Sequence, residues 1–102
     1  MIDPFDLARI VRALRRSRAR RAALRALLEL RVASSPELAA RARVGRADVE
    51  GALVGRMPRY RPRLSLASLG LATPCPTQEG VVFAATDKAL ALASVLSERE
   101  IP

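Results

Sequence analysis

The segment SSPELAARARVGRADVEGAL, residues 34–53, contains two alanine-rich helical stretches with a break between them. Ser35-Pro36 is typical of a helix start, because serine caps the first turn and proline is tolerated at its first position. The pattern predicts a short helix ending at Ala42, a turn over residues 44–46 and a second helix over residues 46–57. Two short helices joined by a three-residue turn are the elements of a helix-turn-helix.

The residues around the break support the same interpretation. Arg43 stands where the motif often has glycine, and Gly45 follows two residues later, so we expect a turn of different shape. Apolar residues at helical spacing would hold the two helices at their angle; they are Leu38, Ala42, Val44, Val49 and Ala52.

Helices precede this segment, and a hairpin and a final helix follow it. Cap residues mark the boundaries, such as Asp3-Pro4 before the first helix, Ser17 before the second and Thr86 before the last. The expected helices cover residues 4–15, 18 to about 32, 64–69 and 87 to about 99, and the expected strands cover residues 71–75 and 81–85. The predicted order is α-α-α-α-(α)-β-β-α, mainly helical with a β-hairpin, in one domain spanning residues 1–102.

The composition argues against several classes of protein. The 102 residues include no histidine and one cysteine, Cys75, so we expect no metal site and no internal disulfide. The chain also lacks a glycine-rich phosphate loop and paired acidic residues on one predicted face, so we expect no enzymatic activity and no cofactor. No apolar run approaches the ~20 residues of a membrane span, and the N-terminus is unlike a secretory signal, which predicts a cytoplasmic protein.

Positive charge is concentrated in two parts of the chain, whose net charge is +8. Residues 1–25 contain eight arginines and two aspartates, and residues 41–63 contain seven arginines and two acidic residues. An abundance of arginine codons in the source genome would explain the choice of arginine over lysine, but not this segregation. Segregated positive charge indicates a polyanionic partner, most often nucleic acid.

A further set of spaced residues follows the helix-turn-helix segment; they are Gly55, Arg59, Tyr60, Ser65, Leu66, Leu69, Gly70 and Leu71. With this spacing, G-x-x-x-R-Y-x-x-x-x-S-L-x-x-L-G-L, and with TDKAL at residues 86–90, the chain resembles the small archaeal winged-helix-turn-helix transcriptional regulators of the MarR/ArsR-like superfamily. The resemblance implies a winged-helix fold and DNA binding, usually as a homodimer. It implies no effector ligand.

In a winged helix, the second helix of the motif enters the major groove of duplex DNA with its N-terminal residues nearest the bases. The candidates for base contact are Arg46, Ala47, Glu50 and Gly51. The candidates for phosphate contact are Arg43, Arg56, Arg59, Arg61 and Arg63, with Arg18, Arg21 and Arg25 as a flank. We expect double-stranded DNA as the partner, because aromatic residues make up only 3% of the chain and single-strand binders use aromatic stacking platforms.

Three features leave alternatives open. Arg46 either reads a guanine or pairs with Glu50 four residues later. The arginines of residues 56–63 either contact phosphates or form a solvated loop. The hairpin segment TPCPTQEGVVF, residues 73–83, has no lysine or arginine and carries Glu79, unlike a wing that grips DNA. The rival function is therefore a protein-interaction module of a transcription, RNA-processing or chromatin assembly.

The last predicted helix is apolar on almost every side, which leaves one face for a second surface. Leu90 and Leu92 lie about 200° apart around a helix axis, so both cannot face one core. A homodimer through the terminal helices would bury the second face and separate the two recognition helices by about 34 Å. The alternative is a monomer whose first helix and core clasp the last helix. The interface candidates are Ile2, Phe5, Leu90, Leu92 and Leu96.

Overall fold

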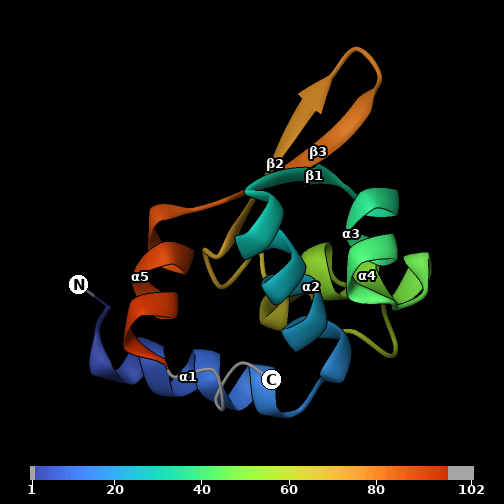
Figure 1. Ribbon diagram of the computed structural model, residues 1–102. Coiled ribbons are helices and arrows are strands. Elements are labelled where there is room, and N and C mark those ends of the chain that lie inside the picture. The colour runs from blue at the N-terminus through green and yellow to red at the C-terminus, as the bar shows by residue number, and fades with distance from the viewer. Residues whose placement is uncertain (1, 97–102) are drawn as a thin grey trace.

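The computed structural model describes residues 2–96, which form five α-helices and one three-stranded antiparallel sheet (Figure 1). The helices are α1 (Pro4–Arg15), α2 (Arg18–Leu30), α3 (Ser35–Ala42), α4 (Arg46–Val54) and α5 (Asp87–Val95). The strands are β1 (Val32–Ser34), β2 (Ala72–Thr77) and β3 (Gly80–Ala85), and a 3-10 helix covers Pro62–Leu64. The protein is therefore mainly helical, with a small sheet.

Side-chain caps begin α1, α2 and α5 where the sequence predicts them. The Asp3 carboxylate accepts a hydrogen bond from the Phe5 N–H at 2.9 Å. The hydroxyl groups of Ser17 and Thr86 each accept one from a backbone N–H three residues later. Each cap satisfies a donor that the first helical turn leaves without a partner, so these three boundaries were predictable from local sequence.

The cap of α3 is Ser34 rather than the predicted Ser35. The Ser34 hydroxyl accepts the Glu37 N–H at 3.4 Å, and the Glu37 carboxylate accepts the Ser34 N–H at 3.0 Å. This reciprocal capping box lowers the pKa of Glu37, chiefly through the bond from the Ser34 backbone. Ser35 is instead the first residue of the helix and is buried.

The sheet has the strand order β1-β3-β2, and both neighbouring pairs are antiparallel. β2 and β3 form the predicted hairpin, in which Thr77 pairs with Gly80 next to the turn. β1 was not predicted from the sequence; it sets the buried Ala33 opposite the buried Phe83. Figure 1 shows the hairpin projecting beyond the helices, with β1 crossing its base.

The core lies around α2, which packs against α1, α3 and α4. Leu24 and Leu27 of α2 are fully buried on the apolar face of this helix. The other fully buried large aliphatic side chains come from all parts of the fold and are Ile10, Leu14, Leu38, Val49, Leu53, Leu66, Leu69, Leu71 and Leu92.

The segment between α4 and β2 differs from the prediction. α4 ends at Val54 rather than at residue 57, because Gly55 turns the chain with a φ of +90°. The backbone also approaches Pro62 there so closely that a Cβ on Gly55 would lie 2.3 Å from the Pro62 Cα. The helix expected over residues 64–69 is replaced by the 3-10 helix at Pro62–Leu64 and by hydrogen-bonded turns after it.

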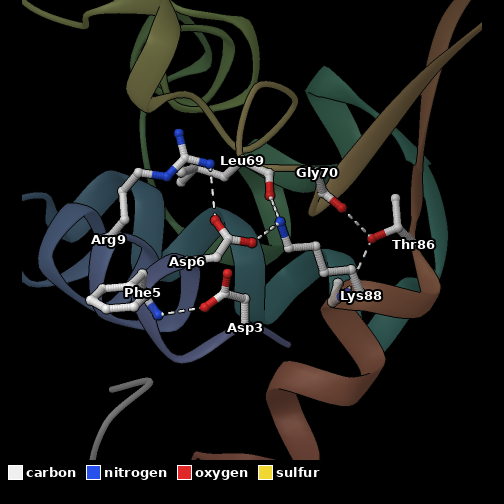
Figure 2. A network of polar contacts seen from close by, with 9 residues as sticks. Asp3, Phe5, Asp6, Arg9, Leu69, Gly70, Thr86 and Lys88 are labelled. Carbon is white, nitrogen blue, oxygen red and sulfur yellow. Dashed lines mark hydrogen bonds and ion pairs between the residues drawn. The ribbon is translucent and has the colours of Figure 1, made fainter. Parts of the chain in front are cut away.

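A polar network ties α5 to α1 and to the segment before β2 (Figure 2). The Lys88 ammonium group pairs with the Asp6 carboxylate and donates a hydrogen bond to the Leu69 carbonyl at 2.8 Å. Asp6 also pairs with Arg9 at 3.0 Å, and the two cations lower the pKa of its carboxyl group, Lys88 the more strongly. The Thr86 hydroxyl donates to the Gly70 carbonyl at 2.6 Å. α5 is therefore held against α1 of its own chain.

The position of α5 corrects part of the dimer prediction. Leu92 is fully buried in the core of its own chain, so its assignment to a dimer interface is wrong. Ile2 and Leu96 are half-buried and pack against the core, and Leu90 is half-buried. Only Phe5 of the five candidates is largely exposed, at 87%. The predicted continuation of the last helix over residues 97–99 lies outside the described residues.

Candidate nucleic-acid interface

The turn between α3 and α4 covers residues 43–45, one residue earlier than predicted. Arg43 has a left-handed backbone conformation, with a φ of +56°, and its N–H donates to the Ala39 carbonyl. Arginine thus adopts the conformation for which glycine is usual at the end of a helix. Gly45 follows as the residue before α4, with a φ of −58° that any residue adopts. The side chain of Arg43 is exposed beside the start of α4.

Three of the four candidates for base contact lie at the surface of α4. Arg46 and Ala47 are exposed in the first turn, and Glu50 is half-buried one turn later. The Arg46 Nε donates to the Glu50 Oε1 at 3.0 Å, so the alternative in which these side chains pair is the arrangement present. The Arg46 side chain nevertheless remains 66% exposed. The pair orients Arg46 without burying it.

The fourth candidate, Gly51, faces inward, so its assignment as a base contact is wrong. It is buried, and the ring of Tyr60 lies directly against it. A Cβ at Gly51 would lie 2.3 Å from the Cδ2 of Tyr60, a distance that no real side chain adopts. The glycine is therefore required for close packing between α4 and the loop that follows it. Helical periodicity alone did not reveal this contact, because Tyr60 reaches α4 from an irregular segment.

Tyr60 anchors the arginine-rich loop to α4. Its hydroxyl donates to the Asp48 carboxylate at 2.8 Å, and its backbone exchanges two hydrogen bonds of 2.7 Å with Arg56. Burial raises the pKa of Tyr60, and the bond to Asp48 raises it further. Asp48 also pairs with Arg59 at 3.4 Å. Tyr60 is therefore buried as an anchor of the loop, and Asp48 lies in the first turn of α4.

The predicted phosphate-contact arginines fall into two groups, one engaged within the protein and one exposed. Arg21 is engaged, because its guanidinium group donates hydrogen bonds to the carbonyls of Leu14 and Arg15 at 2.9 and 3.0 Å, at the end of α1. These bonds add a donor for carbonyl groups of the last helical turn, of which that of Leu14 also accepts the Ser17 N–H. Arg21 is therefore not available for phosphate contact. The other predicted arginines are all exposed; they are Arg18, Arg25, Arg43, Arg56, Arg59, Arg61 and Arg63.

Two adjacent clefts bring most of these arginines together. The larger one, of about 520 Å³, is lined by Arg18, Arg43 and Arg59 from α2, the turn and the loop. The smaller one, of about 320 Å³, is lined by Arg61 and Arg63 together with arginines of α1. Arg16 lines both clefts and joins them. We call the nine arginines that line the two clefts the arginine surface; they are Arg9, Arg12, Arg16, Arg18, Arg20, Arg43, Arg59, Arg61 and Arg63.

Four members of the arginine surface were not among the predicted site residues. Arg9, Arg12 and Arg16 lie on the polar side of α1, where the helical pattern already separates them from the apolar stripe. That pattern could have suggested them. Arg20 carried no such signal, since its burial depends on packing against α1 and Tyr60.

The hairpin forms a different surface beside α4. A cleft of about 710 Å³ separates the two and is lined by Arg46 and Glu50 on one side and by Thr77, Glu79 and Val81 on the other. Exposed apolar side chains lie near it, with Val54 44% and Val81 50% exposed. Residues 72–85 contain no lysine or arginine. The charge of this surface therefore differs from that of the arginine surface.

The described residues hold no cluster suited to a metal ion. Within residues 2–96, no group of three or more histidine, cysteine, aspartate and glutamate side chains is close enough to bind one. Cys75 is half-buried in β2. In the same part of the chain, every helix is too short or too polar to span a membrane.

Fold and site together define a small, mainly helical protein with one antiparallel sheet and an arginine surface beside the start of α4. The chain belongs to the EarA-like family, whose family model matches residues 10–96. That match covers all five helices except the first two turns of α1. Searches of curated proteins and of solved structures found no match.

Proposed function

We propose that this protein is a sequence-specific double-stranded DNA-binding protein and a transcriptional regulator. The observation that carries the proposal is the arginine surface, which lies beside the exposed N-terminal end of α4. Positive charge gathered next to a helix that can enter a groove fits a duplex, because the phosphates flank the groove that the helix reads.

The arrangement of elements supports a winged-helix assignment. Beginning at α2, the order is α2-β1-α3-α4-β2-β3, and β1 pairs with β3 so that the hairpin is joined to the helical part. In this assignment α3 and α4 are the helix-turn-helix, and the β2–β3 hairpin is the wing. α1 and α5 are additions on either side of that unit.

α4 would act as the recognition helix. Its nine residues span about 13 Å at a rise of 1.5 Å per residue, and the major groove is about 12 Å wide. Arg46 and Ala47 lie at the end nearest the bases, and Glu50 holds the Arg46 side chain at the surface. Arg46 would read O6 and N7 of a guanine with the nitrogens that Glu50 leaves free.

The exposed arginines of the loop and of α2 would contact phosphates. Arg59 and Arg61 lie on the segment that Tyr60 fixes to α4, so their backbone positions are set relative to the recognition helix. Such contacts supply affinity and register rather than sequence information. The remaining contacts would come from Arg18, Arg25, Arg43, Arg56 and Arg63.

Single-stranded nucleic acid fits the site less well than a duplex. Proteins that bind single strands stack bases on exposed aromatic side chains. Tyr60, the aromatic residue that lines the larger arginine cleft, is 8% exposed and packs on Gly51. The surface therefore presents charge without a stacking platform.

The rival proposal is a protein-interaction module, and the cleft between α4 and the hairpin favours it. Exposed Val54 and Val81 lie along that cleft. Apolar side chains at the rim of a polar cleft are typical of surfaces that bind other proteins. In that case the arginine surface would be a solvated face.

A titration with random-sequence duplex DNA at two salt concentrations separates the two proposals. Neutralised phosphates release counterions, so the affinity of a DNA-binding protein falls steeply as the salt concentration rises. A binding-site selection from random duplexes then tests sequence specificity. Absence of binding at low salt, or an affinity that does not change with salt, would leave the interaction module as the better proposal.

We also propose a homodimer formed through the outer face of α1. Phe5 is 87% exposed, and a shallow groove of about 580 Å³ on the same helix is lined by Leu7, Ala8 and Val11 together with Arg12, Arg15 and Arg16. Light scattering on the full chain checks this proposal. The dimer predicts twice the chain mass of 11.0 kDa at micromolar concentration. A mass that stays at one chain as the protein is concentrated favours the monomer with an intrachain contact between α1 and α5.

A further inference from the structure

The larger cleft of the arginine surface is formed by several elements of the fold and is not a flat patch. It lies where the end of α1, the start of α2, the turn before α4 and the Tyr60 loop meet. Its volume is about 520 Å³. The polar and charged residues that line it are Arg16, Ser17, Arg18, Arg20, Arg43, Asp48, Arg59 and Tyr60.

Charge in this cleft is unbalanced. Five arginines face a single carboxylate, that of Asp48. Asp48 already accepts the Tyr60 hydroxyl at 2.8 Å and pairs with Arg59 at 3.4 Å. Among residues 2–96, the other four arginines of the cleft have no carboxylate within ion-pair distance. The cleft therefore has an excess of positive charge, which attracts anions.

Arg20 is the most informative of these residues, because it is only 5% exposed. One of its terminal nitrogens donates to the Ala13 carbonyl at 3.3 Å, and its Nε is buried without a hydrogen-bond partner. Its guanidinium carbon lies 5.9 Å from the centre of the Tyr60 ring. Burial lowers the pKa of Arg20, yet an arginine side chain stays protonated. A buried cation without a counter-ion is costly, and an anion in the cleft would offset that cost.

The backbone at the same place also favours an anion. Ser17 caps α2, so the first N–H groups of a 13-residue helix lie at the wall of the cleft. The positive end of the helix dipole attracts anions, and phosphate groups bind there. Arg18 and Arg43 extend from two sides of the cleft with exposed, flexible side chains.

We propose that this cleft binds a phosphate group, held by Arg20 from within and by Arg18 and Arg43 from the rim, and that the phosphate belongs to the backbone of bound duplex DNA. The last part rests on the proposed function. Gly45, the residue before α4, lines the same cleft, so a phosphate held there lies beside the end of the recognition helix. Arg16 continues into the second arginine cleft, which would take a neighbouring phosphate of the same strand. Free phosphate shares this chemistry and is the other source.

Titration with inorganic phosphate, followed by amide and arginine Nε–H signals in NMR spectra, tests the cleft without DNA. Shifts that saturate should cluster at Ser17, Arg18 and Ala19 and at the Arg20 Nε–H. The variant Arg20→Gln should weaken phosphate binding about tenfold or more, because it removes charged hydrogen bonds. The control Arg41→Ala, which removes an exposed arginine of α3 that pairs with Glu29 outside this cleft, should leave binding unchanged.

A second variant, Arg18→Ala with Arg43→Ala, keeps the test valid if Arg20→Gln does not fold. Both side chains are exposed, so the double variant preserves the core. It should also weaken phosphate binding. Shifts spread evenly over all exposed arginines, or unchanged phosphate affinity in both variants, would overturn the proposed cleft.

Duplex DNA supplies the second arm of the experiment. If the phosphate comes from DNA, the double variant should reduce the slope of log affinity against log salt by about 1, because its two arginines hold one phosphate, and Arg41→Ala should reduce it less. Phosphate binding in the cleft without any duplex binding would assign the cleft to free phosphate and contradict the proposed function. Duplex binding with equal slopes in the double variant and in Arg41→Ala would contradict the cleft and leave the proposed function standing.

Discussion

The arginine surface and the β2–β3 hairpin are both exposed beside α4, but they differ in charge and in how they are held. Tyr60 fixes one edge of the arginine surface to α4 through Gly51 and Asp48. The hairpin projects from the helical part and contains no lysine or arginine in residues 72–85 (Figure 1). The positive charge and the projecting hairpin therefore lie on different parts of this protein. A duplex bound by charge would contact the loop and the start of α2 rather than the hairpin.

The largest expected effect comes from Gly51→Ala, which disturbs the arginine surface without changing its charge. The new Cβ would lie 2.3 Å from the Tyr60 ring, so ring and loop must move. Overpacking costs about 1–3 kcal/mol, whereas alanine in place of glycine in a helix gains at most about 1 kcal/mol. We expect a lower free energy of unfolding in urea and weaker duplex binding.

Gly45→Ala is the matched control for this substitution. The nearest atom to a Cβ at Gly45 is the Oδ2 of Asp48 at 3.5 Å, an ordinary contact, and its φ of −58° suits alanine. Stability close to that of the unmodified protein is expected. Equal effects of the two substitutions would contradict the close contact between Gly51 and Tyr60.

The next largest effect should come from Arg59→Ala combined with Arg61→Ala. If both side chains contact phosphates, affinity should fall alike for all duplex sequences, and the slope of log affinity against log salt should decrease by about 2. Filter binding at four salt concentrations measures this slope. A loss confined to one sequence would instead assign these arginines to base readout.

The same measurement on Thr77→Ala combined with Gln78→Ala tests whether the hairpin contacts the duplex. Both residues are exposed next to the turn of the hairpin. Affinity and slope should stay unchanged. A decrease as large as that of the arginine pair would show that the hairpin contacts DNA through neutral side chains.

Arg46→Ala should change preference more than overall affinity. Loss of a two-pronged contact with guanine costs about 1–3 kcal/mol at one base position. A selection from random duplexes should therefore return a site with one relaxed position. If the selected site is unchanged, Arg46 does not contact a base and only pairs with Glu50.

The smallest effect is expected for Glu79→Lys at the hairpin. This change alters the charge by two units, but a hairpin that lies away from the duplex gains little, since the Debye length is about 8 Å at physiological salt. Duplex affinity at 150 mM salt should change by less than about twofold. A tenfold gain would place the hairpin next to phosphates.

Local signals in the sequence were sufficient for much of the fold. Asp3-Pro4, Ser17 and Thr86 set helix starts through bonds to nearby backbone groups, so no long-range information is needed. β1 has only three residues, and its pairing partner lies some 50 positions further along the chain. Because β1 is stabilised by pairing with a distant strand, its own three residues carry little sequence signal.

The candidate site was less predictable for the same reason. Arg43, Arg59, Arg61 and Arg63 were found from charge, which is visible in the sequence. The burial of Gly51 and Arg20 depends on Tyr60, which reaches both from an irregular loop. The engagement of Arg21 at the end of α1 depends likewise on the angle between two helices. Helical periodicity predicts neither the position of the Tyr60 loop nor the angle between these helices.

Mapping of a random-sequence duplex onto the protein by NMR tests the central claim most directly. Signals of the α2 start, the turn at residues 43–45 and the loop at residues 56–63 should shift in proportion to bound DNA, and those of Gln78 and Glu79 should stay in place. Shifts concentrated on the hairpin with none on the arginine surface would contradict the account, as would no shift at all at low salt.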